Sequence, residues 1–279
     1  MVFELIINPI KAEKQPYDMF FIGAFYSSLA VLLSLWIFRE QASMVMVFLT
    51  VLASVHIING VLMLEEDKDM KIRDEKILIK EHGKALSFFI FLFLGFTVGY
   101  LFWNLVLPQS ISNSLFEVQR ATITEINSRI TTGAIITGGV ANESASLLTR
   151  IFYNNIKVLI FCLLFSLFYG SGAIFILAWN ASVIATAMGN VVRLTIGRGI
   201  VSSVGYAIAK YMTHGIMEIA AYFVAGLAGG IISIAIIRHE VGTEGFIRVM
   251  LDSVDLIVMS IFMLAVAAVV EVYVTPSLF

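Results

Sequence analysis

The stretch Thr213-His214-Gly215-Ile216-Met217-Glu218 opens an uncharged apolar run that continues to Ile237. The nineteen residues from Ile219 to Ile237 contain no charged side chain, so the run is predicted to cross a membrane as a helix. His214 and Glu218 are four residues apart and therefore lie on one face of that helix. A carboxylate at the mouth of a membrane helix is costly unless it is paired or faces water. This pair is therefore our first candidate for a functional site.

The composition of the whole chain is that of a membrane protein. Of its 279 residues, 59% are hydrophobic and 14% are charged, whereas ordinary soluble domains carry about 25% charged residues. The net charge of −2 gives no reason to expect a nucleic-acid partner. We therefore predict an all-α, polytopic integral membrane helix bundle that lies in the cell membrane in contact with membrane lipid.

Six apolar runs are long enough to span a bilayer: 19–38, 43–64, 85–107, 156–179, 213–237 and 255–274. A further run, 180–192, has only thirteen residues, fewer than the roughly 17 that a crossing needs. Together with the stripe that ends at Tyr211, it forms either a short tilted span with an interfacial helix or a re-entrant pair. The bundle is thus expected to have six or seven transmembrane helices.

The remaining segments suggest how the chain is divided. Residues 1–18 are predicted to form an amphipathic arm in the membrane interface. Residues 19–107 form an amino-terminal part of three helices, interrupted by the charged stretch 65–84. This stretch is predicted to be a solvated loop that can include a helix facing the lipid headgroups. Because it holds six Lys and Arg residues, it is predicted to be cytoplasmic, which also places the amino terminus in the cytoplasm. Residues 108–153 are predicted to form a polar, partly amphipathic outer segment, and 154–279 the membrane core.

Small residues four apart mark two faces where helices can approach closely. Gly95 and Gly99 form one such face, and Gly226 and Gly230 form the other. We expect these glycines to mediate helix packing, either inside the bundle or in a homodimer.

Other polar residues lie within or beside the apolar runs. We expect Asn154, Asn155 and Asn180 to form hydrogen bonds between helices. His214 and Glu218 form a proton or cation site, form a hydrogen-bonded hinge between two helices, or cap and seat the helix entrance at the interface. Glu271 lies near the end of its span and is expected to be solvated.

The sequence contains no pattern typical of catalysis. Zinc usually takes three protein ligands and a water molecule, but His214 and Glu218 supply only two, so no metal or cofactor is expected. We find no P-loop, no GxGxxG before a helix, no GxSxG elbow and no pairing of acids and histidines typical of a membrane protease. No catalytic residue is assigned, and we do not expect an enzyme.

Several motifs resemble those of one known family. The runs Asn154-Asn155-Ile156-Lys157-Val158, Trp179-Asn180 and His214-Gly215-Ile216-Met217-Glu218 are similar, in this order, to elements of the stage II sporulation protein M family. The segment Asn8-Pro9-Ile10-Lys11-Ala12-Glu13 resembles archaeal members. Thr213 stands where the family usually has proline, and Ala181 where it usually has glycine. The resemblance implies a polytopic membrane protein without a common demonstrated chemistry. In sporulating bacteria the member anchors the machine that drives engulfment.

Two hypotheses for the function follow. The first is a non-enzymatic membrane protein that self-associates, with a dimer favoured, or scaffolds membrane or envelope proteins to organise or remodel the membrane. The second is a channel or transporter for an ion, proton or small solute, with a cavity lined by His214, Glu218, Asn155 and Asn180. Irregular backbone at membrane depth normally lines such a cavity. Convergence of these side chains on a water-filled cavity, or on a dry contact, distinguishes the two.

Overall fold

Helices account for all the regular secondary structure in the residues that the structure describes. The computed structural model describes 9–136, 140–238 and 242–278, with backbone alone at 75, 127, 129–136, 140–143 and 198. Seven helical segments are long and apolar enough to cross a membrane, which confirms the predicted all-α membrane fold. Their helices are α3 (Asp18–Ile37), α4 (Ala42–Lys71), α5 (Glu75–Val106), α8 (Val140–Tyr169), α9 (Ala173–Thr195), α10 (Ile200–Arg238) and α11 (Glu244–Val269).

Shorter helices connect or extend these spans. The helix α2 (Pro9–Lys14) precedes the first span, and α6 (Gln109–Leu115) and α7 (Glu117–Ile136) follow the third. A 3-10 turn, η1 (Ile196–Arg198), joins α9 to α10. After α11, the chain continues as a π-helix, η2 (Val270–Val274), and one final turn, α12 (Thr275–Leu278). Of the expected interfacial arm 1–18, the first eight residues lie outside the described part of the chain.

The charged stretch 65–84 is mostly helical and its residues Glu65, Glu66 and Asp69 are buried, so the prediction that the whole stretch is solvated was wrong. The helix α4 continues to Lys71 and α5 begins at Glu75. Only the residues from Ile72 to Asp74 lie between the two helices, and Asp74 Oδ1 accepts a hydrogen bond from the amide of Lys76 to cap α5. The helices persist because several of the charged side chains are buried and paired, as described below.

The structure also corrects the prediction for 156–192. The helix α8 ends at Tyr169, Gly170 adopts a left-handed backbone with φ of +63°, and α9 begins at Ala173. A single span over 156–179 was therefore wrong. Residues 180–192 belong to α9, which is a complete span of 23 residues rather than a short or re-entrant segment. The stripe up to Tyr211 is the beginning of the long helix α10.

Both glycine faces pack against other helices of the same chain. A Cβ on Gly95 would lie 2.2 Å from the carbonyl oxygen of Phe20, so α3 and α5 approach to backbone contact there. A Cβ on Gly226 would lie 2.8 Å from Ala173 Cβ, and one on Gly230 would lie 2.7 Å from Leu62 Cδ2. Helix α10 is therefore seated against α4 and the start of α9, and it is the most buried of the seven spans.

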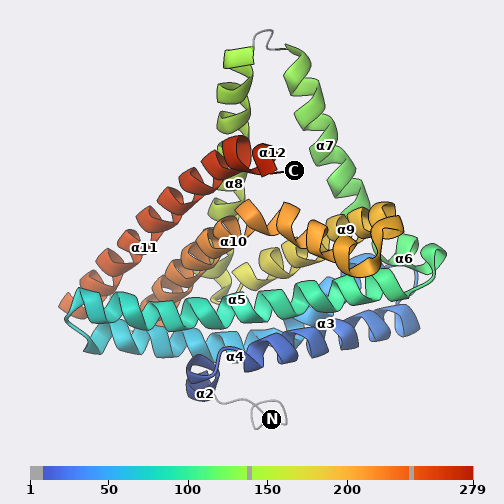
Figure 1. Ribbon diagram of the computed structural model, residues 1–279. Coiled ribbons are helices and arrows are strands. Elements are labelled where there is room, and N and C mark those ends of the chain that lie inside the picture. Colours follow the sequence, from blue (N-terminus) through green and yellow to red (C-terminus); the bar gives the residue numbers. More distant parts are fainter. Residues whose placement is uncertain (1–8, 137–139, 239–241, 279) are drawn as a thin grey trace.

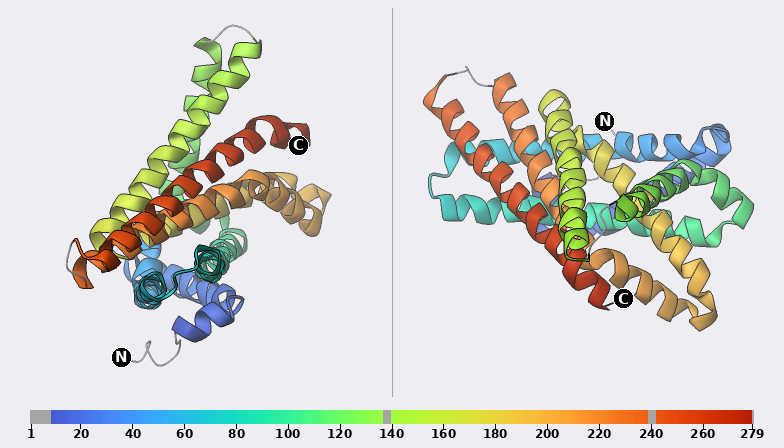
Figure 2. Two further views of the ribbon diagram at one scale, coloured as in Figure 1. Left: turned by 90° about the vertical axis from the view of Figure 1, so that its left-hand side faces the viewer. Right: turned by 90° about the horizontal axis from the view of Figure 1, so that it is seen from above.

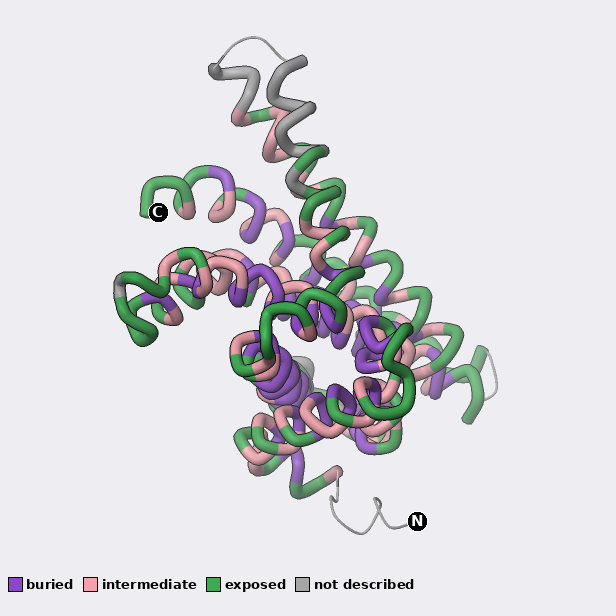
Figure 3. Tube along the Cα trace, turned by 90° about the vertical axis from the view of Figure 1, so that its right-hand side faces the viewer, coloured by how far each residue is buried: buried purple, intermediate pink, exposed green. Residues whose placement is uncertain are grey.

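The polar segment after the third span forms a projecting arm. Helix α7 and the first part of α8 stand away from the bundle, as Figure 1 and the left view of Figure 2 show. Buried residues gather where the spans cross, while exposed residues dominate the described part of this arm (Figure 3). We call the end of the bundle that carries α6 and α7 the arm side. The end that carries the α4–α5 connection is the network side.

Candidate functional site

Glu218 joins two spans through a direct hydrogen bond. Because α10 is continuous from Ile200 to Arg238, His214 and Glu218 occupy successive turns of one helix face, as predicted. Asn155 of α8 donates a hydrogen bond from Nδ2 to Glu218 Oε1 at 2.6 Å. Asn155 itself is buried. Asn155 thus forms a hydrogen bond between helices α8 and α10, and its partner is Glu218.

Glu271 completes this cluster, although we expected it to be solvated. Its side chain is 28% exposed, and its carboxyl group lies within hydrogen-bonding reach of Glu218. His214 Nε2 lies 4.0 Å from Glu271 Oε1, and His214 Nδ1 lies 3.2 Å from Thr275 Oγ1. Glu271 belongs to the π-helix η2, an irregularity that occurs often at functional sites. We call Asn155, His214, Glu218 and Glu271 the carboxylate cluster.

Two of the predicted polar residues, Asn154 and Asn180, are not part of the carboxylate cluster. Asn154 is exposed, because it is one position away from Asn155 on α8 and so points in another direction. Asn180 lies within α9, and its Nδ2 atom is buried without a hydrogen-bond partner. Neither residue forms a described hydrogen bond to the carboxylate cluster.

The carboxylate cluster has the groups needed to hold a proton or a monovalent cation. Two facing carboxyl groups repel when both are ionised, so a shared proton or a monovalent cation would relieve the repulsion. The imidazole of His214 beside Glu271 offers a second place for the proton. In the described residues, no group of three His, Cys, Asp or Glu side chains is arranged to hold a metal ion.

A second polar cluster, which the sequence analysis missed, lies on the network side. It comprises Glu13 of α2, Glu65, Lys68 and Asp69 of α4, and Glu81 and His82 of α5, and we call it the charge network. Glu65 and Asp69 are fully buried, and His82 is 5% exposed. The His82 imidazole bridges the two acids, with Nδ1 at 2.7 Å from Glu65 Oε2 and Nε2 at 3.2 Å from Asp69 Oδ1.

Lys68 and Arg238 connect this region to two further helices. Lys68 Nζ lies 2.7 Å from Glu13 Oε2 and also contacts Glu65. Arg238, at the end of α10, donates to Glu66 Oε2 at 2.6 Å. Because Glu66 is fully buried, this ion pair fixes the end of α10 against the end of α4. Burial, reinforced by the charge of Glu65, raises the pKa of Glu13 to about 7, although Lys68 opposes the shift.

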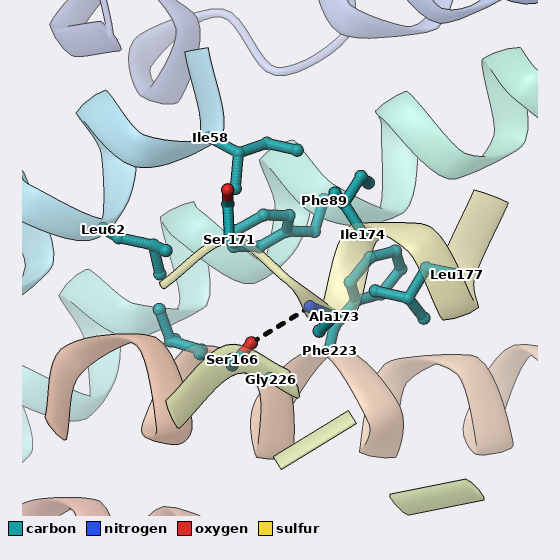
Figure 4. Close-up of a pocket in the computed structure, with 11 residues that line it drawn as sticks. Ile58, Leu62, Phe89, Ser166, Ser171, Ala173, Ile174, Leu177, Phe223 and Gly226 are labelled. Atoms are coloured by element: carbon teal, nitrogen blue, oxygen red, sulfur yellow. Dashed lines mark hydrogen bonds between the residues drawn. The ribbon is translucent and has the colours of Figure 1, made fainter. Parts of the chain in front are cut away.

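A small pocket near the α8–α9 turn is apolar. Its wall is formed by α4, α5, α8, α9, α10 and the turn between α8 and α9. Figure 4 shows Ile58, Phe89, Leu177 and Phe223 around it. Ser166 Oγ accepts a hydrogen bond from the amide of Ala173 at 3.3 Å and thereby holds the turn. None of the side chains proposed to line a polar cavity borders this pocket. The pocket therefore gives no support to a path for ions.

Seven apolar spans, with polar contacts buried between them, define a multi-pass helical membrane protein. The family model of stage II sporulation protein M matches residues 87–276, which is more than half of the chain. The protein therefore belongs to the stage II sporulation protein M family, as its motifs indicated. No curated protein and no solved structure matches the chain.

Proposed function

We propose that this protein is a non-enzymatic membrane scaffold that binds a second copy of itself or an envelope protein and so organises or remodels the membrane. The observation that carries the proposal is the arm, which leaves a tightly packed bundle and extends beyond its spans (Figure 1). Its described α7 surface includes exposed Thr124, Ile126 and Ser128. A polar helix with isolated apolar side chains is suited to binding another protein outside the hydrocarbon region.

The buried features of the bundle are consistent with a scaffold. Asn155 joins Glu218 across α8 and α10, and Arg238 joins Glu66 across α10 and α4. Each contact satisfies a carboxylate that would otherwise be costly to bury. The Gly95 and Gly226 faces are occupied within the chain, so association between copies must use another surface. The arm is the surface that extends farthest from the bundle (Figure 2).

The arm is proposed to lie outside the cell. The Lys- and Arg-rich stretch 65–84 favours a cytoplasmic location for the network side. One span, α5, separates that side from α6 and α7. The pairing of Arg238 with Glu66 supports placing the end of α10 on the same side as the α4–α5 connection.

Cysteine cross-linking in intact cells tests both the contact and the orientation. Ile126→Cys places a thiol on the arm, and Lys71→Cys places a matched thiol on the network side, where Lys71 is 76% exposed. The native Cys162 is buried and provides a low background. We expect a membrane-impermeant bis-maleimide to join Ile126→Cys to a second copy or an envelope protein and to leave Lys71→Cys unmodified. A labelled but uncross-linked arm across several cross-linker lengths would remove the support for a scaffold.

The carboxylate cluster supports a second candidate, a channel or transporter that carries protons or monovalent cations. Glu218 and Glu271 face each other between spans, with His214 nearby. Purified protein in proteoliposomes would then conduct protons, sodium or potassium, and Glu218→Gln would abolish the flux. Equal flux from the wild type and Glu218→Gln, or none from either across a range of pH, would reject this candidate.

A further inference from the structure

Two arginines from different helices lie close together on the arm side. Arg120 is in the first turns of α7, and Arg193 is in the last turn of α9. Arg120 Nη1 donates to Asn190 Oδ1 at 2.7 Å. Arg193 Nη1 donates to Gln109 Oε1 at 2.8 Å, and its Nη2 donates to the carbonyl oxygen of Asn104. These bonds hold the ends of α5, α6, α7 and α9 together.

These hydrogen bonds leave many donors unused. Arg120 Nε and Nη2, Arg193 Nε, and both amide atoms of Asn104 are buried and have no hydrogen-bond partner. Four of these five atoms are donors, and Asn104 Oδ1 is an acceptor. Together they make up five of the twelve buried side-chain nitrogen and oxygen atoms without a hydrogen-bond partner in the described chain. Buried donors normally have partners, because leaving one unsatisfied costs about 1–3 kcal/mol. The concentration of unused donors at one place indicates that a further acceptor belongs there.

Asn104 is held firmly at this position. Its side chain is fully buried, and a Cβ on Gly189 would lie 2.3 Å from Asn104 Oδ1. Gly189 immediately precedes Asn190, the partner of Arg120. The Asn104 amide therefore packs on the same stretch of α9 that receives the Arg120 guanidinium.

The charge of this region is not balanced by the described residues. No carboxylate there forms an ion pair with either guanidinium. Burial, and then the positive charge of Arg193, lower the pKa of Arg120. Both side chains remain partly exposed, so an anion from outside can approach them. An anion bound between them would offset the repulsion and accept the unused hydrogen bonds.

We propose that Asn104, Arg120, Asn190 and Arg193 form a binding site for a phosphate group. Planar guanidinium groups match the oxygen atoms of phosphate and can donate two hydrogen bonds at once. The site lies where the α5 and α9 spans end, which is the depth of lipid headgroups in the adjacent leaflet. A lipid headgroup and free phosphate offer the same chemistry at this site. The proposal does not depend on the scaffold function.

Thermal unfolding of the full chain in dodecyl maltoside tests the site and separates the two sources. Inorganic phosphate is compared with chloride at equal ionic strength, and short-chain phosphatidylglycerol is compared with the matching diacylglycerol. A ligand that binds the folded state raises the unfolding temperature, and the rise grows with the logarithm of the ratio of ligand concentration to Kd. We expect a rise with the phosphatidylglycerol alone if the site takes a headgroup, and a rise with both phosphate compounds if it also takes the free ion.

Matched variants locate the effect. Arg120→Gln and Arg193→Gln should each weaken the apparent affinity about tenfold or more, since each removes a charged donor. Arg150→Gln removes the same charge from an exposed position of α8 and should bind as the wild type does. Arg120→Lys and Arg193→Lys keep the positive charge but lose the planar guanidinium group, so they should also bind the phosphate compounds more weakly. They replace the glutamine variants in the assay if those variants fail to fold. The proposal is overturned if neither phosphate compound stabilises the wild type, or if the arginine variants respond as Arg150→Gln does.

Discussion

Replacing Gly95 with alanine should loosen the contact between α3 and α5. The added Cβ would lie 2.2 Å from the carbonyl oxygen of Phe20 and 2.9 Å from the amide nitrogen of Ala24. Ordinary contact begins at 3.4 Å, so the helices must separate locally by about 1.2 Å, the difference between 3.4 and 2.2 Å. Both obstructing atoms belong to the backbone, which cannot rotate away as a side chain can. Overpacking of this kind costs about 1–3 kcal/mol.

Gly83→Ala is a matched control on the same helix. Nothing lies within 4 Å of a Cβ at Gly83, and alanine favours a helix over glycine by about 1 kcal/mol. Gly95→Ala gains the same helix propensity, so the two variants should differ in free energy of unfolding by the overpacking cost of about 1–3 kcal/mol, with Gly83→Ala the more stable. Reversible unfolding in mixed detergent micelles, followed by tryptophan fluorescence, measures the difference. Equal stability of the two variants would refute the close packing of α3 on α5.

Three other substitutions test the polar clusters. His82→Ala leaves two buried carboxylates without their shared partner and should destabilise the fold by about 3–5 kcal/mol, while Lys80→Ala at an exposed position should have little effect in the same unfolding assay. The pKa of Glu13 is higher in the folded protein than its ordinary value of 4.5, so the folded state binds the proton more tightly and stability should fall as pH rises from 4.5 through 7. Glu13→Gln should flatten that slope in unfolding curves, and an unchanged slope would contradict the assignment. Asn155→Ala should destabilise the protein by about 1–2 kcal/mol through the loss of a hydrogen bond to a carboxyl group, whereas Asn154→Ala should leave the midpoint unchanged.

The sequence predicted the first span well because hydropathy changes sharply at both of its ends. The expected span 19–38 differs by one residue at each end from α3, which the structure places at Asp18–Ile37. The break at Gly170 could not be placed, because apolar residues continue on both sides of it and a window of hydropathy does not register a turn. The run 180–192 therefore seemed too short, although α9 begins before it at Ala173.

Helix geometry predicted the arrangement of the polar clusters only where the residues share one helix. The spacing of His214 and Glu218 placed them on one face. The Asn154-Asn155 motif drew attention to Asn155, but its contact with Glu218 could not be predicted. Glu271 is 53 residues from Glu218, and its orientation depends on a π-helical turn for which the sequence has no signal. The charge network could not be predicted from the sequence for a related reason. A dense run of charges is typical of a solvated loop, and the burial of Glu65 depends on His82 and Lys68 in the folded chain.

The ion pair between Arg238 and Glu66 has a consequence for biosynthesis. The two residues are 172 positions apart, so the ribosome must synthesise four more spans after α4 before the arginine emerges. Throughout that interval the Glu66 carboxylate lacks its ion pair with Arg238. Nascent chains halted before Arg238 should consequently be susceptible to membrane quality-control proteases, and release of the complete chain should end that susceptibility.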